Sequence, residues 1–150
     1  MPIISFPSKP ARRAGLALML LLLPHLAAAQ ECKVDIAIVE KSIGRLETSY
    51  DDILSDISCD APTLKVHQLM CDSSYEYPAG LWRMGRLDDL AWVYAYENAT
   101  KREVDRSDPP RDADFIAKRD ACVDAQCLCN ALIAHTNDSL GGESPYSGGK

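Results

Sequence analysis

Six cysteines constrain the fold of this 150-residue chain more than any other feature. All six follow residue 31, and they are therefore concentrated in one segment of domain size. An even number of cysteines in a small exported domain predicts three disulfides, because an oxidising compartment keeps such pairs bonded. The six positions are Cys32, Cys59, Cys71, Cys122, Cys127 and Cys129.

The first 29 residues have the pattern of a secretory signal peptide. Three basic residues precede an apolar run over residues 16–23, and three alanines at 27–29 then supply the small residues of a cleavage site. The apolar run is too short to span a bilayer, which argues against the alternative of a retained N-terminal anchor. We therefore expect a signal peptide over 1–29, one domain over 30–140 and a flexible glycine-rich tail over 141–150. The mature protein would be periplasmic or secreted, with no stable membrane span.

Metal binding is the alternative use of the cysteines. Cys122, Cys127 and Cys129 are separated by four residues and by one residue, which is not a usual spacing of zinc ligands. We therefore expect neither a metal nor a cofactor, and we expect Cys122 and Cys127 to be able to close a small loop.

The charge of the chain becomes more negative when the signal peptide is removed. Three of the 16 lysine and arginine residues lie in residues 1–29, and none of the 22 acidic residues does, which leaves a net charge of −9. A domain this acidic does not bind nucleic acid non-specifically. The charge suits a cationic partner, or it simply keeps an exported protein in solution.

Apolar residues at helical spacing predict the first element of the domain, over residues 36–57. Such a helix would be about 30 Å long. Cys32 and Cys59 would lie at its opposite ends, beyond the roughly 4.4–6.8 Å between Cα atoms that a disulfide allows. The stripe consists of Ile36, Val39, Ile43, Leu46, Tyr50, Ile53 and Ile57.

Two further helices are expected before residue 105. Asp60 as N-cap and Pro62 in the first turn predict a short helix that ends near Cys71, which would make Cys59 and Cys71 a poor disulfide pair. The third runs from Leu81 to about residue 104. Its seven consecutive apolar or aromatic residues at 90–96 also fit a strand, but no second strand candidate can pair with them. We therefore expect a helix that lies at the centre of a bundle, with a partly exposed contact surface as the alternative.

Two helices are expected after the break at Pro109 and Pro110. Asp112 can cap the first, and a turn near residues 123–125 separates it from the last. The fold class is therefore an all-α, disulfide-stapled bundle of four to five helices.

No constellation of residues marks a catalytic site. The chain has no glycine-rich phosphate loop, no HExxH motif and no nucleophile elbow, and paired cysteines leave no free thiol. After the signal peptide only His67 and His135 remain, each a lone histidine on a helix. We therefore name no catalytic residue. A small hydrolase is the alternative, and it would need a deep pocket with two converging carboxylates or a paired His67.

The segment from Phe115 to Cys122 resembles the signature of the LprI-type lysozyme inhibitor family. In order, that signature consists of an aromatic residue, an aliphatic residue, two variable residues, Arg, then Asn or Asp, one variable residue and Cys. That family consists of small helical exported bacterial domains, and the likeness covers about residues 115–140. The matching positions are Phe115, Ile116, Arg119, Asp120, Cys122, Cys127 and Leu128.

The resemblance implies a protein partner, with a cationic lysozyme as the target. The implied mechanism is occlusion of the lysozyme cleft by an acidic and partly aromatic surface, with association that weakens in salt. The sequence-based candidates for partner contact are Asp88, Asp89, Tyr96 and Glu97. A non-catalytic module of the bacterial envelope with a different partner is the alternative.

Overall fold

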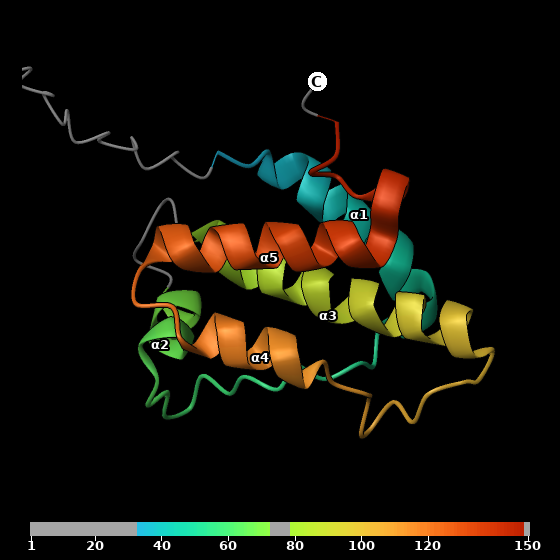
Figure 1. The fold of residues 1–150 in the computed structure, drawn as a ribbon, viewed down its shortest axis with the longest axis horizontal. Coiled ribbons are helices and arrows are strands. Elements are labelled where there is room, and N and C mark those ends of the chain that lie inside the picture. Colours follow the sequence, from blue (N-terminus) through green and yellow to red (C-terminus); the bar gives the residue numbers. More distant parts are fainter. Residues whose placement is uncertain (1–32, 73–78, 149–150) are drawn as a thin grey trace, which may run out of the picture.

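The computed structural model describes residues 33–72 and 79–148, and in these ranges its regular elements are all helices, without a strand. The expected all-α fold with four to five helices is confirmed (Figure 1). The elements are α1 (Ile36–Tyr50), α2 (Lys65–Cys71), α3 (Ala79–Thr100), α4 (Ala113–Asp120), α5 (Ala125–Leu140) and a short 3-10 helix, η1 (Gly141–Glu143).

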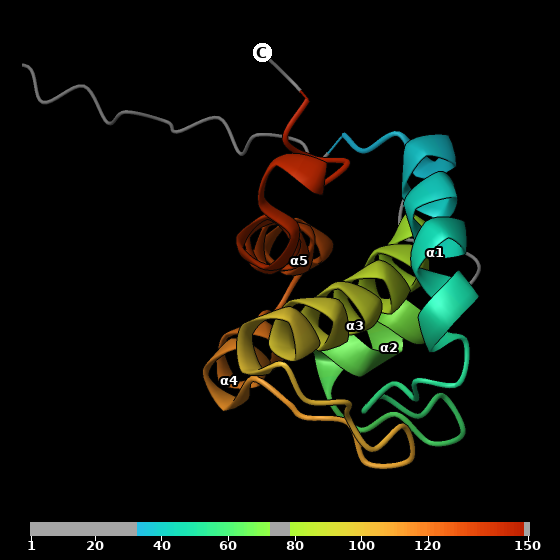
Figure 2. The same ribbon diagram turned by 90° about the vertical axis from the view of Figure 1, so that its right-hand side faces the viewer.

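Helix α3 is the centre of the bundle. It packs against α1, α2 and α5, and Figure 2 shows it lying between α1 and α5. Leu87 and Leu90 are fully buried, which agrees with the expected central position of this helix. The expectation of a helix rather than a strand over this run is confirmed.

The core consists of two clusters of buried side chains that share α3. The first cluster gathers α2, the first half of α3, α4 and the first half of α5, and it includes Val66, Met84 and Leu128. The second gathers α1, the middle of α3 and the residues that end α5, and it includes Val39 and Leu140.

Helix α1 ends seven residues earlier than its apolar stripe predicted. It stops at Tyr50, although Ile53 and Ile57 are still buried, from a non-helical segment. The guanidinium of Arg86 donates to the carbonyl oxygens of Ile53 and, at 3.0 Å, of Asp51. These bonds satisfy carbonyl groups that a continuing helix would have bonded internally, so contacts from α3 end α1.

Helix α2 begins at Lys65 rather than near Asp60, and Leu64 precedes it without a side-chain cap. The segment before it is not helical and brings Cys59 beside the last residue of α2. The prediction that Cys59 and Cys71 are a poor pair is therefore wrong: they form a disulfide with Cα atoms 5.5 Å apart. This bond also agrees with the exclusion of Cys32 as the partner of Cys59.

Helix α4 begins directly after its predicted cap, Asp112, and α5 begins at the turn expected near residues 123–125. The Asp112 carboxylate accepts the backbone N–H groups of Asp114 and Phe115, each at 3.0 Å. Cys122 and Cys127 form the small-loop disulfide that their spacing allowed. Cys129 is also disulfide-bonded.

The segment after Leu140, which we expected to be a flexible tail, packs against the bundle as far as Tyr146. Gly141 has φ +56°, a left-handed conformation that ends α5. Ser144 is buried, and Tyr146 packs against both core clusters. The predicted signal peptide over residues 1–29 lies outside the described residues. In the part of the chain that is described, no helix has the length and apolarity needed to cross a membrane.

Candidate functional site

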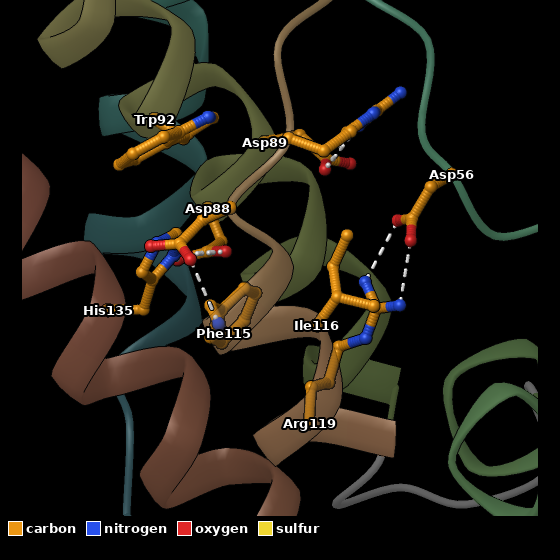
Figure 3. A pocket seen from close by; sticks show the side chains of 10 residues that line it. Asp56, Asp88, Asp89, Trp92, Phe115, Ile116, Arg119 and His135 are labelled. Atoms are coloured by element: carbon orange, nitrogen blue, oxygen red, sulfur yellow. Dashed lines mark hydrogen bonds and ion pairs between the residues drawn. The ribbon is translucent and has the colours of Figure 1, made fainter.

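Charged side chains from five segments converge on a small pocket beside α3 (Figure 3). Helix α3 contributes Asp88 and Asp89, the segment after α1 contributes Asp56, the segment before α4 contributes Arg111, α4 contributes Arg119, and α5 contributes His135. Consecutive positions on a helix point about 100° apart, so Asp88 faces α5 while Asp89 faces the segment after α1.

Asp88 and His135 form a buried pair at one side of this pocket. Asp88 is only 3% exposed, and each of its carboxylate oxygens lies 2.9 Å from Nδ1 of His135. The hydroxyl of Thr136 donates to the same carboxylate at 2.9 Å. Burial by itself would lower the pKa of His135, but the hydrogen bond and charge of Asp88, together with Asp112, raise it above its usual value.

The imidazole of His135 is fixed between aromatic rings. The ring of Phe115 stacks on it with centroids 3.8 Å apart and planes 2° apart, and Trp92 lies at 5.4 Å. Nε2 of His135 is 3.4 Å from a carboxylate oxygen of Asp112. This nitrogen is buried and makes no hydrogen bond to any described residue.

Asp89 occupies the other side of the pocket. Its carboxylate lies 3.3 Å from the guanidinium of Arg111, which also donates to the carbonyl of Leu54 at 2.7 Å. Burial raises the pKa of Asp89 to about 7, although a hydrogen bond with Ser55 and the charge of Arg111 act in the opposite direction.

Arg119 connects several residues at the pocket through ion pairs and a contact with an aromatic ring. Its side chain is 5% exposed, and its two terminal nitrogens bind both oxygens of Asp56 at 2.9 and 2.7 Å. Its Nε donates to Asp120 at 2.8 Å, and its guanidinium lies over the ring of Phe115 at 5.9 Å. Arg119 holds the pKa of Asp56 below its usual range, despite the partial burial of that carboxyl.

The residues of the Phe115–Cys122 signature therefore have structural partners. Phe115 stacks on His135, Arg119 binds Asp56, Asp120 accepts from Arg119 and lies 3.5 Å from His67, and Cys122 is bonded to Cys127. Ile116 packs against the first core cluster, and Leu128 is fully buried within it. The signature thus fixes α4 against its neighbours.

The pocket is too small for a substrate in this conformation. Its volume is about 20 Å³, which is room for about one water molecule. It has the converging carboxylates that a hydrolase would need, but they are engaged with Arg111, Arg119 and His135. In the described parts of the chain, no group of three or more His, Cys, Asp and Glu side chains is placed to hold a metal ion.

The four residues expected to contact a partner do not form one open surface. Asp88 is buried, which removes it from any contact surface, and Asp89 is mostly covered beside Arg111. Glu97 accepts from the hydroxyl of Tyr50 at 2.8 Å and from the backbone N–H of Val104 at 2.9 Å. Only Tyr96 remains clearly exposed. The sequence could not show that α3 has neighbours on so many sides.

An open groove between α4 and α5 lies next to the pocket. Its volume is about 250 Å³, and His135 and Phe115 belong to both the groove and the pocket. The α4–α5 groove is lined by Asp112, Asp114, Phe115, Lys118, Ala131, Ala134, His135 and Asp138. Sequence reasoning treated His135 as a lone helical histidine, because its partners lie up to 47 residues away in the chain.

Comparison of the chain with protein-family models, with curated proteins and with solved structures found no match.

Proposed function

We propose that this chain is an exported bacterial protein that binds a cationic protein partner without catalysing a reaction, and that a lysozyme is its target. Binding would block access to the cleft of the lysozyme. The proposal combines the acidity of the chain with the resemblance of residues 115–140 to the LprI-type inhibitors.

The observation that carries the proposal is that most arginines are paired with carboxylates of the same chain. Six of the seven arginines in the described residues form ion pairs with carboxylates of the same chain. Residues 30–150 carry nine more acidic than basic side chains, so these pairs leave an excess of carboxylates with no cation of their own. Such a surface attracts a positively charged protein and speeds its association.

Export to the periplasm or beyond the cell is the second part of the proposal. The disulfides Cys59–Cys71 and Cys122–Cys127 support an oxidising compartment, where lysozymes are encountered. The signal-like pattern of residues 1–29 supports the same location.

The test is turnover of purified cell walls by a c-type lysozyme while the oxidised protein, residues 30–150, is titrated in. We expect saturable inhibition that weakens as salt is raised, because screening acts on the charge attraction. Direct binding would be measured by calorimetry under the same conditions.

Cytochrome c, a basic protein of similar size, provides the matched control for charge alone. Tighter binding to lysozyme than to cytochrome c would support a specific complex. Equal binding to both would reduce the proposal to a non-specific charge effect. A folded, fully oxidised protein that neither binds nor inhibits any class of lysozyme would overturn it and favour an envelope module with a different partner.

A further inference from the structure

We propose that the α4–α5 groove binds one arginine or lysine side chain of the cationic partner. This inference rests on the proposed function for the identity of the partner. The binding of a basic side chain by the groove can be tested separately from the lysozyme.

The size of the groove suits a single long side chain. Its volume of about 250 Å³ lies below the roughly 300–1,000 Å³ of sites for small-molecule ligands and cofactors. Phe115, Ala131 and Ala134 provide apolar contact for the methylene groups of lysine or arginine. Such side chains bury their stems against apolar surface while the charged head stays among polar groups.

The charge of the groove selects a cation over an anion. Three carboxylates line it, from Asp112, Asp114 and Asp138, against the single ammonium group of Lys118. Neither Asp114 nor Asp138 forms an ion pair with any residue that the structure describes. These two carboxylates are therefore available to a guanidinium or ammonium group from outside.

His135 provides the second and independent indication of a ligand. Its side chain is 11% exposed, and its buried Nε2 makes no hydrogen bond to a described residue, although the Asp112 carboxylate lies 3.4 Å from it. When the ring is neutral and Asp88 is ionised, Nδ1 holds the hydrogen, because a carboxylate can only accept, and Nε2 is then an acceptor that faces the Asp112 carboxylate at 3.4 Å. An N–H donor that enters the groove satisfies this nitrogen.

Binding of a cation at this position competes with the second proton of His135. The imidazole faces Asp88 and Trp92 from α3, Asp112 and Phe115 at the start of α4, and Thr136, its neighbour on α5. Further out along the groove lie Asp114, Lys118 and Asp138. Both nearby carboxylates favour a positive charge, which either the proton or the ligand can supply. The affinity for the cation therefore rises as pH is raised through the pKa of His135 in the free protein.

The first experiment titrates N-acetyl-arginine amide into the oxidised protein and follows the His135 ring and the methyl groups of Ala131 and Ala134 by NMR. N-acetyl-citrulline amide is the matched control, because it has nearly the same shape without the charge. Saturable shifts confined to the groove, seen with arginine but not with citrulline, are expected. No shifts, or equal shifts with both probes, would overturn the inference.

The pH dependence of the same titration tests the role of His135. We expect the affinity for the arginine probe to rise with pH in the wild type, and to lose this step in His135→Gln. An unchanged pH dependence in a folded His135→Gln variant would contradict a role for Nε2. If that variant does not fold, the pKa of His135 in the wild type decides the question, because bound probe must lower it.

The second experiment measures lysozyme binding by the double variant Asp114→Asn with Asp138→Asn. The charge-matched control is Asp51→Asn with Asp60→Asn, since both residues are exposed and neither lines the groove. We expect the groove variant to bind about tenfold more weakly and the control less than about twofold more weakly. Equal weakening in both variants would be compatible with the proposed function but would exclude the groove as the site of contact with lysozyme. If the wild type binds no lysozyme, the proposed function fails and the arginine probe alone decides the inference.

Discussion

At the scale of single residues, Arg119 shows how a sequence signature can be structural. It lies almost wholly out of solvent and holds Asp56, Asp120 and the ring of Phe115. A buried guanidinium with two carboxylate partners costs stability when either side is removed, because the remaining charges lose their compensation. The arginine of the signature therefore contributes to folding, through these contacts, rather than to ligand binding.

Replacement of Arg119 by alanine is expected to lower the free energy of unfolding by about 2–3 kcal/mol, because Asp56 and Asp120 lose their shared cation. Arg45→Ala is the control, since Arg45 pairs with Glu143 at the surface. That change is expected to cost less than about 1 kcal/mol. Urea unfolding measures both, and equal losses would contradict the assigned role of Arg119.

Asp89 predicts a pH dependence of stability. Burial raises its pKa from 3.8 to about 7, so between about pH 4 and pH 7 the folded state holds a proton that the unfolded state has released. Stability therefore falls as pH rises through this window. Asp89→Asn removes this loss of stability. The free energy of unfolding of the variant, relative to that of the wild type, should therefore rise by roughly 2–4 kcal/mol from pH 4 to pH 8. Urea unfolding at both pH values checks it, and a constant difference between the two proteins would refute the assignment.

At the scale of elements, the end of α1 is set by a side chain of another helix. Three arginines that follow in the sequence donate to carbonyl groups of the segment around Tyr50: Arg86 to Asp51 and Ile53, Arg106 to Ser49, and Arg111 to Leu54. These carbonyl groups have no strand or helix to bond with, and so they depend on the arginines.

Arg86→Met keeps most of the side chain but removes the donors to Asp51 and Ile53 and the contact with Glu47 at 3.0 Å. We expect a loss of about 2 kcal/mol in the free energy of unfolding, because carbonyl groups lose their partners. Hydrogen exchange should accelerate first over residues 51–57. Uniform acceleration across the molecule, or no change, would show that Arg86 does not hold this segment. Arg45→Met is the matched control.

At the scale of the whole molecule, the two core clusters are joined by more than α3. Val34 from the start of the described chain and Tyr146 from its end pack against both clusters. An aromatic side chain packed at such a junction is expected to couple the two halves during unfolding.

Tyr146→Ala is expected to lower the free energy of unfolding by about 2 kcal/mol, because apolar contact with both clusters is lost. Tyr146→Phe is the matched change. The buried hydroxyl has no hydrogen-bond partner among the described residues, so its removal should not lower the free energy of unfolding by more than about 0.5 kcal/mol. Thermal unfolding followed by circular dichroism measures both. A large loss in Tyr146→Phe would indicate a partner for the hydroxyl.

The features that the sequence determined by itself are those set by neighbours in the chain. Apolar spacing predicted the central helix, Asp112 marked the start of α4, and the five-residue separation of Cys122 and Cys127 allowed their disulfide. Each depends on contacts within a few residues, where helix geometry and capping preferences act directly.

The tertiary structure alone decided where α1 ends, which cysteine bonds to Cys59, and which carboxylates are buried. The apolar stripe could not reveal that Arg86 would bind the carbonyl groups after Tyr50. Likewise, the pairing of Asp88 with His135 joins residues 47 positions apart, and it places Asp88 inside rather than on a contact surface. Such contacts depend on how the helices are arranged around α3, and no short stretch of the sequence indicates that arrangement.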